Sequence, residues 1–492
     1  MPFQTLLSSL TIYYLSFALS LDYSATLVSI EEYWLTLDGE TTAYGIVFGS
    51  YALAQIISSP IFGYLADRRG TKFALCVSIV INACGNALYG LAYVLNSKHV
   101  VLWGRFVSGF GAGSLILGIV HITNTASRED RGWIVANYRI AQSLAYLGGP
   151  FLGIAFIPLH LPDGIDNNGT TSTKEKILNF YTTPAWVTML NDLLVMLPMV
   201  LVLFKNPFAP HAAMRFYYKD AKALIFHTAM IGLILFIGNL CLWGIISKLF
   251  SFAFGQYHII TKQSDLWKVY IAAGIAFFAG SLALRYLIKS RLSAVALGVI
   301  GLATNLMGFL FLLDFNMKQL DSTIFFYLGS VLTMFGGIWF LTGTIVYYSQ
   351  KMTDLSNQAR NRRGFLMGML NIADAFGRFI GPTVLTPIMK IQSSNQLSCR
   401  PIKWNPENCI LSNVNVAIPI SMVLVFVNIV LLQYYHWKYG RTDFEATGSL
   451  VSHATLSVQS QSQMQLEEVG NLELLDDDVF VDNISLHDQQ FI

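Results

Sequence analysis

The sequence predicts an all-α integral membrane protein with twelve transmembrane helices. Hydrophobic residues make up 54% of the 492 residues and charged residues only 12%, whereas a soluble domain carries about 25% charged residues. Apolar runs of about 20 residues, the length that crosses a bilayer as a helix, recur until about Trp437, where the composition changes. These observations exclude an ordinary soluble enzyme, a disordered protein and a strongly basic protein that binds nucleic acid.

The apolar runs place the twelve helices in order along the chain, with polar loops between them. The first run extends from Leu6 to Ile30 and has no basic segment before it. It is too long for a cleavable signal peptide, so we interpret it as the first span. The predicted spans lie near 5–30, 41–66, 73–95, 99–124, 132–159, 183–205, 222–247, 266–288, 293–314, 323–347, 364–389 and 414–437.

The distribution of charged residues predicts that both termini are cytosolic. With this topology, the cytosolic segments before the tail hold 18 Lys and Arg residues and 5 Asp and Glu residues, and the opposite loops hold 10 and 11. Basic residues are enriched on the cytosolic side of membrane proteins. The sequence Asn168-Gly169-Thr170 then provides the glycosylation acceptor of the far side, Asn168.

Two cysteines lie in one non-cytosolic loop. Cys399 and Cys409 fall between the eleventh and twelfth predicted spans, in a compartment that is oxidising during synthesis. They are candidates for a local disulfide, and the alternative is a pair of free loop thiols.

The C-terminal tail is strongly acidic. From Asp443 to Ile492 it contains ten acidic residues and no Lys or Arg, a composition typical of a disordered cytosolic extension. Leu474 and Leu475, between Glu473 and Asp476, resemble an acidic dileucine sorting signal. The alternative is a solvated segment without a trafficking role.

The chain contains an internal repeat. Arg131-Gly132 is followed seventeen residues after the glycine by Gly149-Pro150, and Arg363-Gly364 is followed at the same spacing by Gly381-Pro382. Segments that recur six helices apart indicate two parallel, pseudo-symmetric six-helix halves. We expect halves at 1–205 and 223–440, a cytosolic linker at 206–222 and the tail at 441–492.

Short motifs identify the family that this architecture resembles. The segment from Gly63 to Lys72, GYLADRRGTK, between the second and third predicted spans, is similar to the loop signature of the major facilitator superfamily. Arg105 with Gly109, Gly111 and Gly113 resembles the family's motif in the fourth helix. The resemblance implies the major facilitator fold and transport of a solute by alternating access.

A narrower resemblance concerns one branch of this family. The strings Tyr51–Gln55, Ser59–Gly63 and Phe180–Pro184 are similar to the lysosomal major facilitator proteins implicated in neuronal ceroid lipofuscinosis. This resemblance implies a multi-pass protein of the lysosomal or late endosomal membrane, with the plasma membrane as the alternative. It also implies either a solute carrier or a chloride-conducting protein.

The motifs give candidate gating residues, which would control the opening of the two sides. Glycines permit close approach of helices, and prolines loosen the helical backbone where neighbours can satisfy it. In the family the loop aspartate, here Asp67, lies near the cytosolic start of helix eleven. The gating candidates are Gly63, Asp67, Arg68, Arg69, Gly70, Gly149, Pro150, Gly381 and Pro382.

Charged residues within the predicted spans are candidates for substrate contact or ion coupling, because charges in a bilayer are expensive and usually functional. Asp22 and Arg105 lie at similar depths on helices that face the central cavity of the family. An acid that exchanges its proton for contact with an arginine is a coupling device. The alternative is a static ion pair between two helices.

The other charges in the spans are Asp374, Arg378, Arg139 and Asp192. Asp374 and Arg378 are spaced i, i+4, which favours an intrahelical pair, although Arg378 would bind an anion if it faced the cavity. Arg139 has no acidic partner on its own helix and suits a carboxylate, phosphate or chloride. We assign Asp192 a structural role, because helix six usually packs outside the cavity.

The sequence leads to three functional hypotheses. It contains no GxSxG, HExxH, Walker or CxxC motif, so we expect no enzyme, no cofactor and no metal site. The first hypothesis is a secondary transporter of a small, anionic solute, with proton coupling. The alternatives are an anion or chloride channel on the same fold and a non-transporting receptor or assembly partner. We expect a monomer in the lipid bilayer, sorting adaptors at the tail and no nucleic acid.

Overall fold

The computed structural model describes most of the predicted helical region. The described residues are 3–27, 29–40, 43–126, 130–156, 177–205, 218–251, 266–289, 292–313, 319–355, 363–388, 391–393, 409–411 and 414–440. Two compact units divide the chain at Tyr434, and the second unit is described only as the helical residues 435–440. The predicted linker and tail therefore lie largely outside the described residues, and the domain boundaries stay a prediction.

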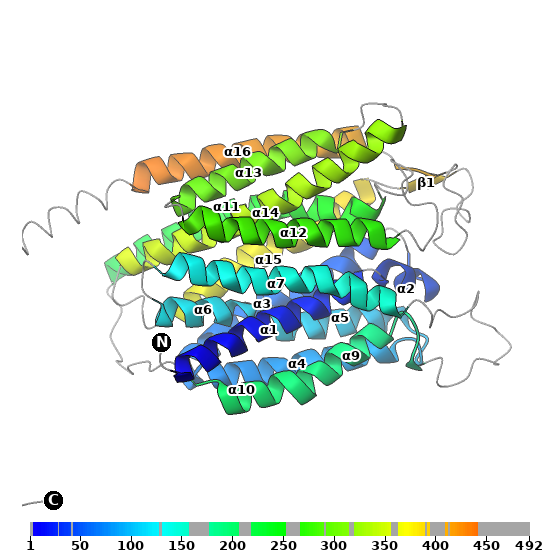
Figure 1. The fold of residues 1–492 in the computed structure, drawn as a ribbon, viewed down its shortest axis with the longest axis horizontal. Coiled ribbons are helices and arrows are strands. Elements are labelled where there is room, and N and C mark those ends of the chain that lie inside the picture. Colours follow the sequence, from blue (N-terminus) through cyan, green and yellow to red (C-terminus); the bar gives the residue numbers. More distant parts are fainter. Residues whose placement is uncertain are drawn as a thin grey trace, which may run out of the picture. The chain divides into compact units, whose positions relative to one another are not determined.

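The first group of helices corresponds to the first six predicted spans. These elements run side by side in Figure 1, in blue to green-cyan. They are α1 (Phe3–Leu27), α2 (Ile30–Thr36), α3 (Tyr44–Arg69), α4 (Thr71–Leu91), α5 (Lys98–Ala112), α6 (Leu115–Thr125), α7 (Arg131–Ala155), α9 (Thr183–Asn191), the π-helix η3 (Asp192–Met196) and α10 (Leu197–Leu203).

The second group corresponds to the last six predicted spans. It also contains a two-stranded antiparallel sheet in the loop before the last helix, in which Gln392 pairs with Ile410. The elements are α11 (Tyr218–Ser251), α12 (Leu266–Lys289), α13 (Ala294–Phe311), α14 (Gln319–Leu355), α15 (Arg363–Ile388), β1 (Ile391–Ser393), β2 (Cys409–Leu411) and α16 (Val414–Gly440).

Two predicted spans are interrupted rather than continuous. The span near 99–124 divides into α5 and α6 at Gly113 and Ser114, because the glycines of this segment weaken the helix. The span near 183–205 contains η3 between α9 and α10. Pro198 follows η3 and donates no backbone N–H, which disrupts the regular hydrogen-bond ladder. The short helix α2 and the two strands were not predicted.

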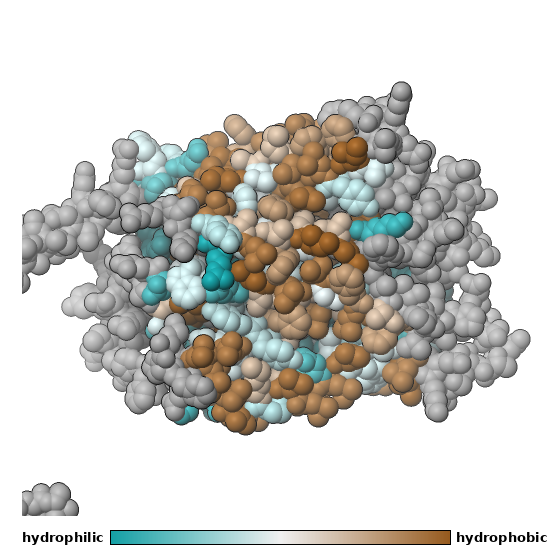
Figure 2. Space-filling view, viewed as in Figure 1, coloured by the Kyte–Doolittle hydropathy of each residue, from teal (hydrophilic) through white to brown (hydrophobic). Residues whose placement is uncertain are grey.

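Hydropathy distinguishes most of the described helices as candidate membrane spans. Eight described helical segments are long and apolar enough to cross a membrane. The spans formed by α1, α7, α12 and α15 are not among them. The helices α7 and α15 carry Arg139, Asp374 and Arg378, which lower their hydropathy. Figure 2 shows hydrophobic residues spread across the visible face of the described helices, as a bilayer requires.

The two groups of helices meet through two antiparallel pairs. The helix α3 packs against α15, and α7 packs against α12. Within the groups, α1 packs against α7 and α11 packs against α15, which are equivalent pairs in a repeat of six spans. The major facilitator fold predicted from the repeat is therefore the fold observed, and it brings α3, α7, α12 and α15 together where the two groups meet.

Candidate functional site

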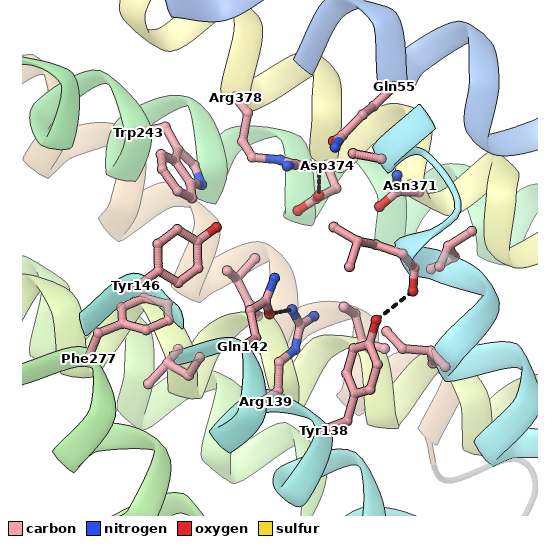
Figure 3. Close-up of a pocket in the computed structure, with 17 residues that line it drawn as sticks. Gln55, Tyr138, Arg139, Gln142, Tyr146, Trp243, Phe277, Asn371, Asp374 and Arg378 are labelled. Carbon is pink, nitrogen blue, oxygen red and sulfur yellow. Dashed lines mark hydrogen bonds and ion pairs between the residues drawn. The ribbon is translucent and has the colours of Figure 1, made fainter. Parts of the chain in front are cut away.

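A pocket lies between the two groups of helices. It has an empty volume of about 650 Å³, part of which is open to solvent, and its lining comes from α3, α5, α6, α7, α11, α12, α14 and α15. In Figure 3 the side chains of Arg139 and Gln142 face Asp374 and Arg378 across the pocket. The polar lining residues are Gln55, Tyr138, Arg139, Gln142, Tyr146, Trp243, Asn371, Asp374 and Arg378.

Arg139 reaches the pocket without a carboxylate partner among the described residues. Its Nη1 donates a hydrogen bond of 2.6 Å to Oε1 of Gln142, one turn along α7. Its Nε is buried and has no hydrogen-bond partner in the described structure. A guanidinium presents N–H donors in a planar fork that matches a carboxylate or phosphate. Arg139 therefore has donor capacity that a neutral amide does not satisfy.

Asp374 and Arg378 form the intrahelical pair that their spacing predicts. Arg378 Nη2 lies 2.6 Å from Asp374 Oδ2, and Asn239 on α11 donates a hydrogen bond of 2.8 Å to Asp374 Oδ1. Both residues also line the pocket. Arg378 therefore forms the intrahelical ion pair and faces the cavity at the same time. The pocket contains two guanidinium groups and one carboxylate, and its formal charge is positive.

Further donors without partners lie around the same pocket. In the described structure, the side chain of Gln55 forms no hydrogen bond, and neither do Nε1 of Trp243 and Nε of Arg378. Buried polar groups are nearly always hydrogen-bonded in proteins. The unpaired donors therefore indicate that a polar ligand or water completes the pocket.

Asp22 and Arg105 are brought into one buried region but do not form the direct ion pair that their depths predict. Asp22 is 0% exposed and Arg105 is 1% exposed. The Arg105 guanidinium instead lies over the rings of Tyr23 and Tyr51, at 5.4 and 4.7 Å, and its Nη1 donates a hydrogen bond of 2.7 Å to Thr26 Oγ1. The predicted depths of Asp22 and Arg105 in the membrane brought the two residues into the same region. The rings of Tyr23 and Tyr51 determine where the Arg105 guanidinium lies within it.

Aromatic side chains lie between this buried region and the pocket. The ring of Tyr23 is 5.9 Å from that of Trp243 and 6.2 Å from that of Tyr146, and both of those residues line the pocket. Tyr23 therefore contacts Arg105 on one side and pocket residues on the other. This contact links the two charged regions of the protein.

Asp192 has surroundings that the sequence did not reveal. It is 1% exposed, and Asn82 on α4 donates a hydrogen bond of 2.7 Å to its Oδ2. Asp22 lies near enough to interact with it electrostatically. The expectation that Asp192 only packs outside the cavity overlooked this group. The signal available in the sequence was the i, i+4 spacing of Asn82 and Asn86 in an otherwise apolar helix.

The gating candidates of the loop motif contact the start of α15. The carboxylate of Asp67 accepts hydrogen bonds from the backbone N–H groups of Gly364, at 3.1 Å, and Phe365, at 2.9 Å. A carboxylate at the N-terminus of a helix is stabilised by the helix dipole. A Cβ on Gly63 would lie 2.3 Å from the carbonyl oxygen of Gly364, so a glycine is needed for this close approach.

The other motif residues around Asp67 have structural contacts. Arg68 and Arg69 lie over the rings of Tyr64 and Phe73, at 5.2 and 5.3 Å. Gly70 has a φ of 90°, a conformation that favours glycine, and separates α3 from α4. These contacts fix the turn that holds Asp67 against α15.

The two Gly-Pro pairs of the internal repeat lie in equivalent contacts. A Cβ on Gly149 would meet Ser24 on α1, and a Cβ on Gly381 would meet the carbonyl oxygen of Leu240 on α11. Pro150 and Pro382 follow within α7 and α15. Each pair thus allows the fifth helix of its group to approach the first helix of that group closely.

Several predicted site residues lie outside the described residues. They are the glycosylation candidate Asn168, the disulfide candidate Cys399 and the sorting candidates Leu474 and Leu475. Cys409 is described only as the first residue of β2. The roles of these residues stay predictions.

Comparison with known proteins gives a family and a fold. A family model described as Major Facilitator Superfamily matches residues 6–382. Major facilitator superfamily domain-containing protein 8 of Xenopus laevis is 29% identical over 182 residues, which are 36% of this chain and 35% of that protein. An SPX domain-containing membrane protein of Arabidopsis thaliana is 32% identical over 122 residues, 25% of this chain and 17% of that protein. The chain thus matches about a third or less of the length of these relatives.

Solved structures resemble the chain over most of its length. The human organic anion transporter MFSD10 (TETRAN) has a TM-score of 0.62 at 15% identity, covering 88% of this chain and 100% of that chain. A variant of the Escherichia coli fucose:proton symporter FucP has a TM-score of 0.57 at 17% identity, covering 88% and 98%. At such identities the likeness concerns the fold alone.

Proposed function

The chain belongs to the Major Facilitator Superfamily, and we propose that it is a secondary transporter that moves a small anionic solute by alternating access across the lysosomal or late endosomal membrane. The observation that carries this proposal is the positive pocket between the two groups of helices. Its lining includes Arg139, which has no carboxylate partner among the described residues, and Arg378. A multi-pass fold with a polar central pocket is suited to solute transport.

The charge of the pocket favours an anion. Two guanidinium groups and one carboxylate leave one positive charge uncompensated in a partly enclosed pocket. A buried charge without a counter-ion is unfavourable, and a bound carboxylate or phosphate would neutralise it. Hydrogen bonds to charged groups contribute about 1.5–3 kcal/mol each, enough to discriminate an anion from a neutral solute of similar size.

Contacts on both sides of the pocket support alternating access. On one side, Gly63 and Asp67 contact the start of α15. On the other side, Tyr23 on α1 contacts Trp243 on α11. Each contact joins the two groups of helices, and we infer that the two contacts break in turn as the groups rock. Protonation of Asp22 is the proposed coupling step.

The organelle is proposed from the sequence. The strings around Tyr51 and Phe180 resemble the lysosomal branch of the family, and Leu474 and Leu475 resemble a sorting signal. Immunofluorescence of the full chain is expected to coincide with a lysosomal marker, and Leu474→Ala with Leu475→Ala is expected to shift it to the plasma membrane. Plasma-membrane staining of the unchanged chain would contradict this location.

Uptake by proteoliposomes tests the transport proposal. The purified protein is reconstituted and offered a mixture of small mono-, di- and tricarboxylates and inorganic phosphate, and the lumen is analysed by mass spectrometry. We expect saturable uptake of at least one anion. Arg139→Gln should weaken its apparent affinity about 10–100-fold, because a charged hydrogen bond of ~1.5–3 kcal/mol is lost.

A matched control separates the pocket from general charge. Arg285→Gln makes the same substitution on an exposed part of α12 and should leave uptake unchanged. Equal effects of the two substitutions, or no uptake of any anion, would contradict the proposed substrate class. Unitary currents in planar bilayers would favour the alternative, an anion channel on the same fold.

A further inference from the structure

A second group of buried charges lies away from the central pocket, within the first group of helices. Asp22 on α1 is 0% exposed and Asp192, at the start of η3, is 1% exposed. Neither Asp22 nor Asp192 lines the pocket. Two carboxyl groups without access to water require an explanation, because each ionised carboxylate loses its hydration on burial.

The two carboxyl groups share their neighbours. The side chains of Asn82 and Asn86, one turn apart on α4, interact with both Asp22 and Asp192. The Asn82 amide donates a hydrogen bond of 2.7 Å to Asp192 Oδ2, and Thr188 donates one of 3.3 Å to Asp22 Oδ1. Shared amides place both acids in one polar group, where ionisation of one affects ionisation of the other.

The charges around this group balance if it holds one proton. Arg105 is the cation that interacts with Asp22. The other titratable neighbours are phenols, which are uncharged near neutral pH: Tyr14, Tyr23, Tyr51 and Tyr89. Two ionised aspartates with Arg105 would leave a net negative charge in a buried site. One proton on the two carboxyl groups makes the group neutral.

An unpaired acceptor indicates where a protonated carboxyl group can donate a hydrogen bond. Asn82 Oδ1 is buried and has no hydrogen-bond partner in the described structure, and the same holds for Asp22 Oδ2. A carboxylate cannot donate to the Asn82 carbonyl oxygen, but a protonated carboxyl group has one O–H donor. The orphaned acceptor therefore fits one protonated carboxyl group, and two orphaned donors of the same group, Asn86 Nδ2 and Arg105 Nη2, fit one ionised carboxylate.

We propose that Asp22 and Asp192 form a single proton-binding site in which two carboxyl groups share one proton, with Arg105 as the balancing charge. The two carboxyl groups behave as one unit, because two buried carboxyl groups that interact and share hydrogen-bond partners are not both ionised. Its use as the coupling site rests on the proposed transport function. The existence of the shared proton does not, and it is tested without a substrate.

Infrared spectroscopy of the full-length protein at neutral pH tests the site. A protonated carboxyl group has a carbonyl band that is separate from carboxylate bands and shifts in D₂O. Asp22→Asn and Asp192→Asn should each remove the same protonated-carboxyl band, because the remaining acid no longer has a second carboxylate beside it and ionises. The double variant should remove no more of this band than either single variant does.

The opposite result is well defined. If one aspartate holds the proton independently, only its own substitution removes the band, and this would overturn the shared site. Asp130→Asn, the same substitution in the exposed turn just before α7, should change carboxylate bands alone. If sodium ions remove the protonated-carboxyl band at constant ionic strength, the site binds a cation. This result would also overturn the proposal.

A second measurement covers the case in which a variant does not fold. Wild-type protein labelled with ¹³C at aspartate carboxyl groups is titrated and followed by NMR. A shared proton gives coupled titration, in which carboxyl signals shift in two separated steps. Single-step curves for every buried aspartate signal would contradict the proposal.

Discussion

Single buried charges in this protein are held mainly by neutral groups. Arg105 lies over two tyrosine rings and donates to a threonine hydroxyl, and Asp192 accepts from an asparagine amide. Spacing along the chain predicts partners on the same helix, such as Asp374 and Arg378. It does not predict partners on other helices, because these depend on helix rotation. For this reason the sequence indicated the region of Arg105 but not its contacts, and it missed the group around Asp192.

Arg105 is expected to be important for stability as well as for coupling. Arg105→Ala would remove the cation that balances Asp22 and two cation–π contacts, at a cost of about 3–5 kcal/mol in comparable buried sites. Arg105→Lys keeps the charge but loses the planar stacking, so its effect should be intermediate. The measurement is unfolding in mixed micelles with increasing denaturing detergent. The control is Lys98→Ala, which removes a solvent-exposed hydrogen bond to the Asp38 carbonyl oxygen. If the Arg105→Ala variant were as stable as this control, Arg105 would have no stabilising role.

At the scale of helices, glycines determine how closely the elements pack. The apolar runs predicted where the helices occur, because hydropathy depends on composition. The breaks within two of them were not predicted, since a helix that is interrupted at Gly113 or contains η3 has the same hydropathy as a continuous one. Close contacts also depend on position: a Cβ on Gly109 would lie 2.3 Å from the carbonyl oxygen of Tyr51.

Two glycine substitutions test this packing as a matched pair. Gly109→Ala must separate α5 from the backbone of α3 and should destabilise the protein by about 1–3 kcal/mol, as overpacking does. A Cβ on Gly148 would meet a single side-chain atom, at 3.7 Å. Gly148→Ala should therefore be neutral or stabilise α7 by about 0.5–1 kcal/mol. Thermal unfolding followed by tryptophan fluorescence measures both, and equal losses for the two variants would contradict the contact.

At the scale of the whole molecule, the repeat and the loop motif predicted the architecture well. Both rest on sequence landmarks that are independent of side-chain packing, and the family match agrees with them. The pocket was predicted only through its charged members. Its uncharged donors, Gln55 and Trp243, come from different helices and have no shared pattern in the sequence.

The topology is tested by glycosylation. If both termini are cytosolic, Asn168 lies on the luminal side and is the acceptor site there. Asn168→Gln should then abolish any shift in gel mobility that a glycosidase produces in the protein from mammalian cells. A shift that persists in this variant would contradict either the topology or the site.

The central claim is that one pocket is exposed to the two sides of the membrane in turn. To test it, the five cysteines of the chain are replaced and a single cysteine is placed at Ile116, which lines the pocket. A membrane-impermeant thiol reagent is then applied from either side of oriented vesicles. We expect labelling from both sides. Asp67→Asn should shift it toward the cytosolic side, by up to roughly 30-fold if the helix-terminus contact contributes ~2 kcal/mol. Labelling from the same single side in both proteins would contradict alternating access.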